Sequence, residues 1–112
     1  MAEPLVGTSI LSEAHAIVYG DRERTYGSPA KNLETIAAYW TAHLRARGFM
    51  ADSSVLSADD VAIMMTGLKL ARLANDVEHR DSQVDACGYL ALLERIQGAN
   101  AIVSGLPQPT RD

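Results

Sequence analysis

The sequence contains little cysteine, few aromatic residues and no long apolar run, and each shortage excludes a class of protein. One cysteine, Cys87, excludes an internal disulfide framework and a cysteine-based zinc cluster, and it fits a reducing cytoplasm. No apolar run approaches the roughly 20 residues that cross a bilayer, so we expect no membrane span. Residues 1–4 contain the acidic Glu3 and no basic side chain, and no apolar segment follows them, so we expect no secretory signal.

The charges are acidic in sum and unevenly placed. Ten basic and fourteen acidic residues give a net charge of −4, which argues against sequence-independent binding to nucleic acid. Residues 22–47 carry five basic and two acidic side chains, whereas residues 52–85 carry seven acidic and three basic ones. Such halves can complement one another within the fold or between subunits, or they can lie on unrelated solvated faces.

Apolar residues recur at helical spacing in four segments, and no segment alternates in the manner of a strand. The spacing predicts helices over 9–19, from Pro29 to Gly48, from Ser57 onward, and over 82–96. Three glycines are expected to end helices, namely Gly20 in a left-handed conformation, Gly48 and Gly98.

These elements predict an all-α fold, a four-helix up-and-down bundle, because short links favour antiparallel neighbours. We expect one domain over residues 1–102 and a loose C-terminal tail over 103–112, where glycine and prolines prevent a helix from continuing. The third helix is expected to face the core with Val61, Met64, Met65, Leu68 and Ala71.

Asp81 and Asp85 are the first candidate site, because their spacing of four places both carboxylates on one helix face. Two like charges at this spacing destabilise a helix by about 0.2–0.5 kcal/mol. A bound divalent cation such as magnesium would reverse that sign and leave waters for a phosphate substrate. The alternative is that Asp81 caps the helix and Asp85 is an exposed acid favoured by the helix dipole.

Lys69 and Arg72 are neighbours on the third predicted helix, at the edge of its apolar stripe. Their cations can extend into solvent, or they can reach a phosphate or the carboxylates of the fourth helix. The sequence leaves both options open.

The joint between the first two helices carries Arg22, Arg24 and Tyr26 beside a helix N-terminus, where free amides attract anions. The two arginines can bind phosphate and the tyrosine can stack on a base. Asn32, one turn into the next helix, is the nearest amide that can contact a base edge. An ordinary surface turn with balanced charge is the alternative.

Taken in order, these motifs resemble a small helical domain of unknown function that is common in phages and prophages. The same order is similar to the nucleotide modification associated domains, in which a Tyr-Gly turn, a Lys-x-x-Arg helix and an Asp-rich helix start recur. The likeness covers roughly residues 10–93. The motifs that carry it are the run 21–29 with Asn32, Asp60-Val61-Ala62, Leu68-Lys69-Leu70-Ala71-Arg72, Asp81-Ser82 and Asp85-x-x-Gly88-Tyr89.

More distantly, the layout resembles the MazG-like nucleotide pyrophosphohydrolases, all-α oligomers that hold magnesium with acidic pairs on two helices. The resemblance implies magnesium on Asp81 and Asp85, with Asp60 or Glu34 completing the set, and Lys69 beside them offsetting phosphate charge. The sequence departs from that pattern, because the first acidic pair is missing and the second has one extra intervening residue.

Two hypotheses follow. In the first, the chain is a phage nucleotide-handling protein, a magnesium-dependent (d)NTP pyrophosphohydrolase. Its catalytic residues are Asp81, Asp85 and Lys69, and its substrate-binding residues are Arg22, Arg24, Tyr26, Asn32 and Arg72.

In the second hypothesis it is a non-enzymatic helical module that sequesters a nucleotide or docks on a protein. Asp81–Arg72 and Asp85–Lys69 are then structural ion pairs, and exposed methionines at 64 and 65 mark a partner surface. Under either hypothesis we expect a homo-oligomer, because a four-helix domain with few aromatic residues gains core by pairing.

Overall fold

The computed structural model describes residues 9–20 and 29–104, and within them all regular structure is helical. The predicted all-α class is therefore confirmed. The helices are α1 (Ile10–Tyr19), α3 (Pro29–Ala46), α4 (Ala58–Asn75) and α5 (Arg80–Ser104). None of these described helices is long and apolar enough to span a membrane.

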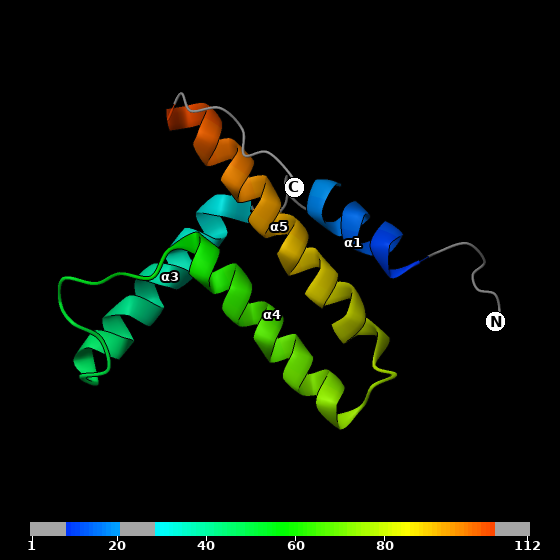
Figure 1. The fold of residues 1–112 in the computed structure, drawn as a ribbon, viewed down its shortest axis with the longest axis horizontal. Coiled ribbons are helices and arrows are strands. Elements are labelled where there is room, and N and C mark those ends of the chain that lie inside the picture. Colours follow the sequence, from blue (N-terminus) through cyan, green and yellow to red (C-terminus); the bar gives the residue numbers. More distant parts are fainter. Residues whose placement is uncertain (1–8, 21–28, 105–112) are drawn as a thin grey trace, which may run out of the picture.

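The helices pack around the long helix α5 (Figure 1). α4 and α5 lie side by side and run in opposite directions, because only residues 76–79 join them. α1 packs against α5, and α3 packs mainly against α4 with a smaller contact to α5. The predicted bundle of four helices is consistent with this arrangement of the described residues.

Local sequence signals set the ends of α3 and α4. Ser57 caps α4 in a capping box, because its side chain accepts from the Asp60 amide while the Asp60 carboxylate accepts from the Ser57 amide at 2.8 Å. Gly48, at a φ of 80°, ends α3 as predicted. Its amide and that of Phe49 donate back to carbonyls in the last turn of α3, the two hydrogen bonds of a Schellman motif.

The core lies where α3, α4 and α5 meet, and it is built from aliphatic residues. Its buried members are Leu33, Ala37, Ala58, Val61, Ala62 and Ile96, with Ile36, Trp40, Leu56, Met65, Leu92 and Leu93 packed around them. Apolar residues at helical spacing in the segments 29–48 and 82–96 therefore supply much of this core. Each fully buried side chain of Val, Leu or Ile size contributes about 1.5–3 kcal/mol.

The outer face of α4 differs from the prediction. Met64, Leu68 and Ala71 were expected in the core, but all three are exposed. α4 is apolar around most of its circumference, so a sequence pattern does not reveal which side the neighbouring helices cover. The packing selects the side of Val61, Ala62 and Met65.

α5 is longer than predicted at both ends. It begins at Arg80, and His79 precedes it as the N-cap with its ring Nδ1 accepting from the Ser82 amide at 3.3 Å. Asp81 is therefore not the cap. Gly98 does not stop the helix, which continues to Ser104 because a mid-helix glycine costs only about 1 kcal/mol. Residues 105–112 of the expected tail lie outside the described part of the chain.

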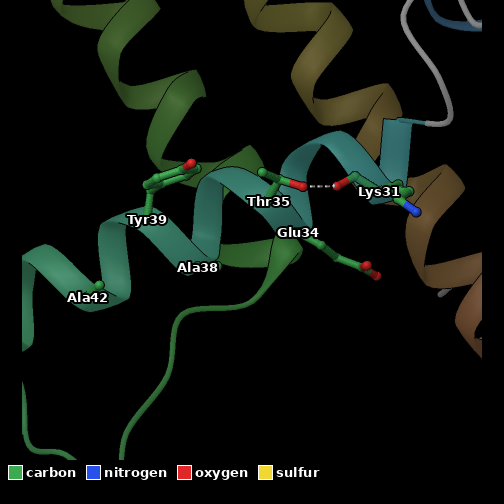
Figure 2. A pocket seen from close by; sticks show the side chains of 6 residues that line it. All are labelled: Lys31, Glu34, Thr35, Ala38, Tyr39 and Ala42. Atoms are coloured by element: carbon green, nitrogen blue, oxygen red, sulfur yellow. Dashed lines mark hydrogen bonds between the residues drawn. The ribbon is translucent and has the colours of Figure 1, made fainter.

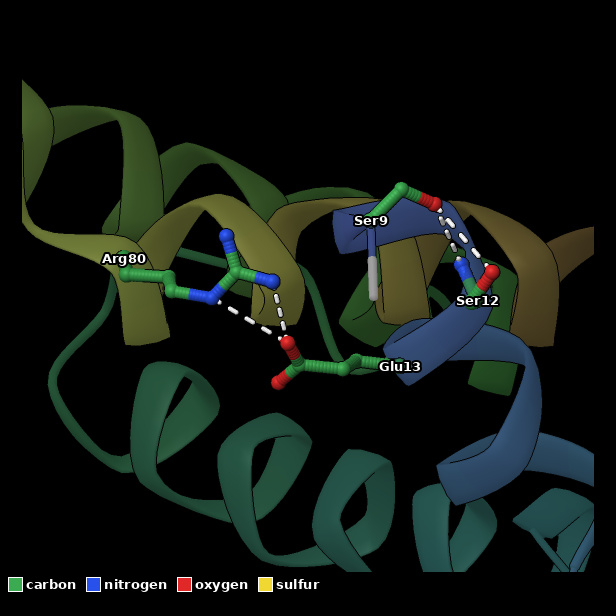
Figure 3. Close-up of polar contacts among 4 residues, drawn as sticks. All are labelled: Ser9, Ser12, Glu13 and Arg80. Atoms are coloured by element: carbon green, nitrogen blue, oxygen red, sulfur yellow. Dashed lines mark hydrogen bonds and ion pairs between the residues drawn. The ribbon is translucent and has the colours of Figure 1, made fainter. Parts of the chain in front are cut away.

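α1 is attached to α5 by a polar contact at each end. Glu13 accepts from the guanidinium of Arg80 at the start of α5, with a distance of 3.1 Å from the Arg80 Nε (Figure 3). At the other end, Arg95 donates to the carbonyl of Val18 at 2.8 Å and lies over the Tyr19 ring. An arginine on the last carbonyls of a helix also complements its dipole.

Gly20 follows α1 directly but is not left-handed, since its φ is −94°. The left-handed stop predicted there is wrong. A Cβ at this position would lie 2.2 Å from the carbonyl oxygen of Ala16. Glycine is needed at position 20 because of this close approach of backbone to backbone, and not because of a positive φ.

Candidate functional site

A pocket of about 230 Å³ lies where α1 and α3 both approach α5. Most of its lining residues are apolar, but polar and apolar groups contribute about equally to its wall. The lining residues are Ile17, Val18, Asn32, Leu33, Ile36, Val84, Asp85, Gly88, Tyr89 and Leu92. Small-molecule sites are usually concave with mostly apolar walls, and this one is smaller and more polar than most.

Gly88 makes part of the room in this pocket. It is buried on the face of α5 that meets α1, and a Cβ there would lie 4.0 Å from the Val18 side chain. The sequence predicts close approach of a helix or ligand at this glycine, and the structure places both α1 and the pocket beside it. A larger side chain at position 88 would occupy the space that a ligand needs.

Asp85 joins the pocket to Lys69 of α4. Its Oδ2 lies 3.0 Å from the Lys69 Nζ, and the Lys69 side chain is only 12% exposed against 39% for Asp85. The ion pair predicted between these residues is therefore formed. Lys69 holds the carboxylate from the α4 side while Asp85 also lines the pocket, so the pair orients a hydrogen-bond acceptor at the pocket wall.

Asn32 reaches the same pocket from α3, and Tyr89 reaches it from α5. The amide of Asn32 can donate and accept, and the carboxylate of Asp85 accepts. Tyr89 adds a ring and a hydroxyl to this set. Its place beside Asp85 in the pocket was not predicted from the sequence, although the interval of four residues puts both side chains on one helix face.

The carboxylates assigned to magnesium do not gather in the described residues. Asp60 is held in the capping box of α4, where its Oδ2 accepts from the Ser57 amide and hydroxyl. Asp81 is exposed and does not line the pocket, whereas Asp85 is paired with Lys69. Across residues 9–20 and 29–104, no three His, Cys, Asp or Glu side chains are placed to hold a metal ion. These residues do not fit a resident magnesium ion.

The remaining candidate residues are dispersed. Arg72 is exposed on α4, does not line the pocket, and makes no ion pair with Asp81 within the described residues. Arg22, Arg24 and Tyr26 lie outside the described part of the chain. The segment that contains them leaves α1 at Gly20 and enters α3 at Pro29, next to residues that line the pocket.

A second, larger and more open hollow lies along α3. Its described lining comes from one helix face, the side chains of Lys31, Glu34, Thr35, Ala38, Tyr39 and Ala42 (Figure 2). The Thr35 hydroxyl is used locally, because it donates to the Lys31 carbonyl at 3.1 Å. Glu34, the alternative magnesium ligand, lies here and not in the pocket of Asp85.

His79 and Ser82 form a polar contact at the start of α5 that the sequence did not predict. The buried Ser82 hydroxyl lies 2.7 Å from His79 Nδ1, the same atom that accepts from the Ser82 amide. The direction of the hydroxyl–ring hydrogen bond follows the tautomer of the imidazole. The Asp81-Ser82 motif thus builds a helix start here.

The chain is similar to proteins of phages. The family described as Domain of unknown function (DUF6378) matches residues 9–97. Gene 55 protein of Mycobacterium phage L5 is 39% identical over 89 residues, and Gene 55 protein of Mycobacterium phage D29 is 36% identical over 88 residues. These matches cover 80% and 79% of the chain and 53% of each relative, so the chain spans about half the length of these proteins. No solved structure matches it.

Proposed function

Since the chain belongs to the DUF6378 family, whose function is unknown, we propose a function from its own residues: it binds a nucleotide with the base in the α1–α3–α5 pocket. One observation carries this proposal. Asp85 lies at once in the pocket wall and in an ion pair with the nearly buried Lys69. An ionised acceptor held in place beside apolar walls suits a planar ring that bears an amino donor.

The pocket's size and lining support a base and not a whole nucleotide. A volume of about 230 Å³ is enough for a ring system. Ile36, Val84 and Leu92 supply apolar surface for the ring, and Tyr89 supplies an aromatic side chain. A carboxylate at the wall disfavours phosphate, so the phosphates are expected outside the pocket mouth.

Residues of the segment between α1 and α3 complete the proposal. We assign Arg22 and Arg24 to the phosphates and Tyr26 to stacking, from their residue types and their place between α1 and α3. In this proposal Lys69 has the structural part of the second hypothesis, an ion pair with Asp85, and does not offset phosphate charge. It is a positioning residue for that carboxylate.

We propose nucleotide binding, and hydrolysis of the bound nucleotide is measured separately. Pyrophosphate release of the MazG type uses magnesium held by several carboxylates. Asp81, Asp85 and Asp60 do not converge in the described residues, so we derive no step through a resident metal. Magnesium enters this proposal as the counterion of a triphosphate, carried with the substrate.

The test is calorimetric titration with canonical and modified (d)NTPs and their nucleosides, with and without magnesium, alongside a pyrophosphate-release assay. We expect saturable binding of at least one nucleotide. Asn32→Ala and Asp85→Asn should each weaken it about 10- to 100-fold, the value of one to two hydrogen bonds to a charged or amide group. Gly88→Val should abolish it by filling the pocket.

Asp52→Asn is the matched control, because Asp52 is an exposed acid in the loop between α3 and α4. It should bind like the parent protein. Circular dichroism and urea unfolding of each variant separate lost binding from lost folding. Absence of binding for every nucleotide and nucleoside at millimolar concentration would overturn the proposal, and pyrophosphate release would extend it to an enzyme.

A further inference from the structure

We propose that the nucleotide bound in the α1–α3–α5 pocket carries guanine, and that the Asp85 carboxylate recognises this base by accepting from its N1–H and its 2-amino group. This inference rests on the proposed nucleotide binding and goes further by naming the base. Its basis is the set of hydrogen-bonding groups that the pocket residues do not use among themselves.

Three polar side chains that line the pocket have unused hydrogen-bonding capacity. Oδ2 of Asp85 lies 3.0 Å from the Lys69 ammonium, whereas no ion pair or hydrogen bond engages Oδ1 within the part of the chain that the structure describes. The side-chain amide of Asn32 and the hydroxyl of Tyr89 also have no hydrogen-bond partner among the described residues. Polar groups on a pocket wall that no neighbour satisfies are available to a ligand.

Asp85 offers acceptors only. Its carboxylate is ion-paired with Lys69 and is therefore ionised. A carboxylate has two oxygens with about four acceptor positions, and the Lys69 ammonium occupies one of them. Acceptor positions therefore remain on both oxygens, side by side. They are complementary to two adjacent donors on a ligand, and they repel a ligand that brings an acceptor to the same place.

Guanine is the common base that has two adjacent donors on its pairing edge. Its N1–H and its 2-amino group lie side by side, spaced like the two oxygens of a carboxylate. Adenine and cytosine each place an amino donor next to a ring nitrogen that accepts, and uracil and thymine place one N–H between two carbonyls. Each of these bases would set an acceptor against the Asp85 carboxylate, so this residue favours guanine.

The other polar groups of the pocket match the rest of the guanine edge. O6 of guanine is an acceptor next to N1, and it needs a donor from the protein. The Asn32 amide and the Tyr89 hydroxyl can each donate, and they reach the pocket from α3 and α5. Because these residues and Asp85 line one space of about 230 Å³, a single ring system can contact the carboxylate and one of the donors together.

Calorimetric titration of the parent chain with nucleosides tests recognition of the base without the contribution of phosphates. We expect guanosine to bind most tightly, and adenosine, cytidine and uridine to bind at least about 100-fold more weakly. Inosine lacks only the 2-amino group and should bind about 10- to 100-fold more weakly than guanosine, the value of one hydrogen bond to a charged group. 7-Deazaguanosine is the matched control ligand, because it keeps the whole pairing edge, and it should bind like guanosine.

Asp85→Asn tests the residue by changing what it presents to the base. An asparagine side chain presents one acceptor and one donor, which suits xanthine, whose N1–H lies beside a 2-carbonyl. The variant should lose affinity for guanosine and gain affinity for xanthosine, so that the ratio of the two dissociation constants changes at least about 100-fold. Asp52→Asn removes the same charge from the loop after α3 and should leave the preference for guanosine unchanged.

The outcomes distinguish the choice of guanine from nucleotide binding itself. Binding of adenosine, cytidine or uridine as tight as that of guanosine, or equal binding of inosine and guanosine, would overturn the choice of guanine and leave nucleotide binding intact. These comparisons use the parent chain, so they hold even if Asp85→Asn does not fold. Equal loss of guanosine and xanthosine in a folded Asp85→Asn would overturn Asp85 as the group that recognises the base. Absence of binding for every nucleoside and nucleotide at millimolar concentration would overturn the proposed function, and this inference with it.

Discussion

Lys69 and Asp85 show how one ion pair serves both the fold and the candidate site. Lys69 comes from α4 and Asp85 from α5, so their contact at 3.0 Å joins the two antiparallel helices. Lys69 is the more buried partner and loses more hydration on folding. Asp85 keeps partial contact with solvent and with the pocket, which leaves its carboxylate available to a ligand.

We predict that this pair is coupled in stability. In a double-mutant cycle of Lys69→Met and Asp85→Asn, the coupling free energy from urea unfolding should be about 1 kcal/mol, a value reduced by the solvent exposure of Asp85. Glu13→Gln with Arg80→Gln is the matched cycle at a pair whose side chains are both more than a third exposed, and its coupling should be smaller. Equal coupling in the two cycles would contradict the importance of Lys69 burial.

Residue spacing predicts which charged groups can meet but not which of them do. Lys69 and Arg72 are both within reach of the next helix by sequence, and Asp81 and Asp85 are both acids on its first turns. Of these four described residues, only Lys69 and Asp85 form an ion pair with each other. The rotation of α4 turns Lys69 toward α5 and leaves Arg72 exposed. That rotation is a property of helix packing.

At the scale of the element, Gly48 and Gly88 illustrate two different uses of glycine. Gly48 ends α3 with a positive φ, whereas Gly88 lies inside α5 without one. A side chain at position 48 is strained whatever space surrounds it. At position 88 a methyl group would make an ordinary contact with Val18.

The same substitution at these two glycines should therefore change the free energy of unfolding in opposite directions. Gly48→Ala should lower the free energy of unfolding by about 1 kcal/mol, because alanine is disfavoured in the left-handed region. Gly88→Ala should raise it by about 0.5–1 kcal/mol through better helix propensity. Urea unfolding of both variants beside the parent checks this. A loss of stability at Gly88→Ala would mean that α1 and α5 approach more closely than the 4.0 Å contact indicates.

At the scale of the whole molecule, α1 is the element whose attachment decides whether the pocket exists. It contributes Ile17 and Val18 to the pocket and contacts α5 along one side only. Two polar contacts, Glu13–Arg80 and Arg95–Val18, secure its ends. An element held by one packed face and two such contacts is expected to open before the α4–α5 hairpin does.

Arg95→Met should make this local opening easier. It keeps the apolar stem but removes the hydrogen bond to the Val18 carbonyl and the cation over the Tyr19 ring. We expect amides of residues 10–19 to exchange about 5- to 30-fold faster, the equivalent of about 1–2 kcal/mol. Hydrogen exchange followed by mass spectrometry measures this.

Arg47→Met is the control for that experiment. Its guanidinium also lies over an aromatic ring, that of Phe49, but in the loop after α3. It should leave exchange in α1 unchanged. Unchanged exchange of α1 in Arg95→Met would instead show that apolar packing on α5 alone holds this helix.

The sequence by itself determined the helical class, the four helices of the described residues and several of their ends. Helical periodicity, the serine at 57 and the glycine at 48 are local signals, and hydrogen bonds within a few residues are enough to express them. The stop signal at Gly98 was weak, because a glycine inside a helix lowers its stability by only about 1 kcal/mol. The free energy gained from further turns of α5 outweighs this cost, so the helix continues to Ser104.

Only the tertiary structure decided which residues share a site and which apolar residues stay exposed. Asn32, Asp85 and Tyr89 meet because α3 and α5 are packed at a particular rotation, and Asp60 is absent from that site for the same reason. α4 is apolar on nearly every side, so its pattern cannot tell core from surface. Long-range packing makes that choice, since the free energy of burial depends on area removed from water and not on order along the chain.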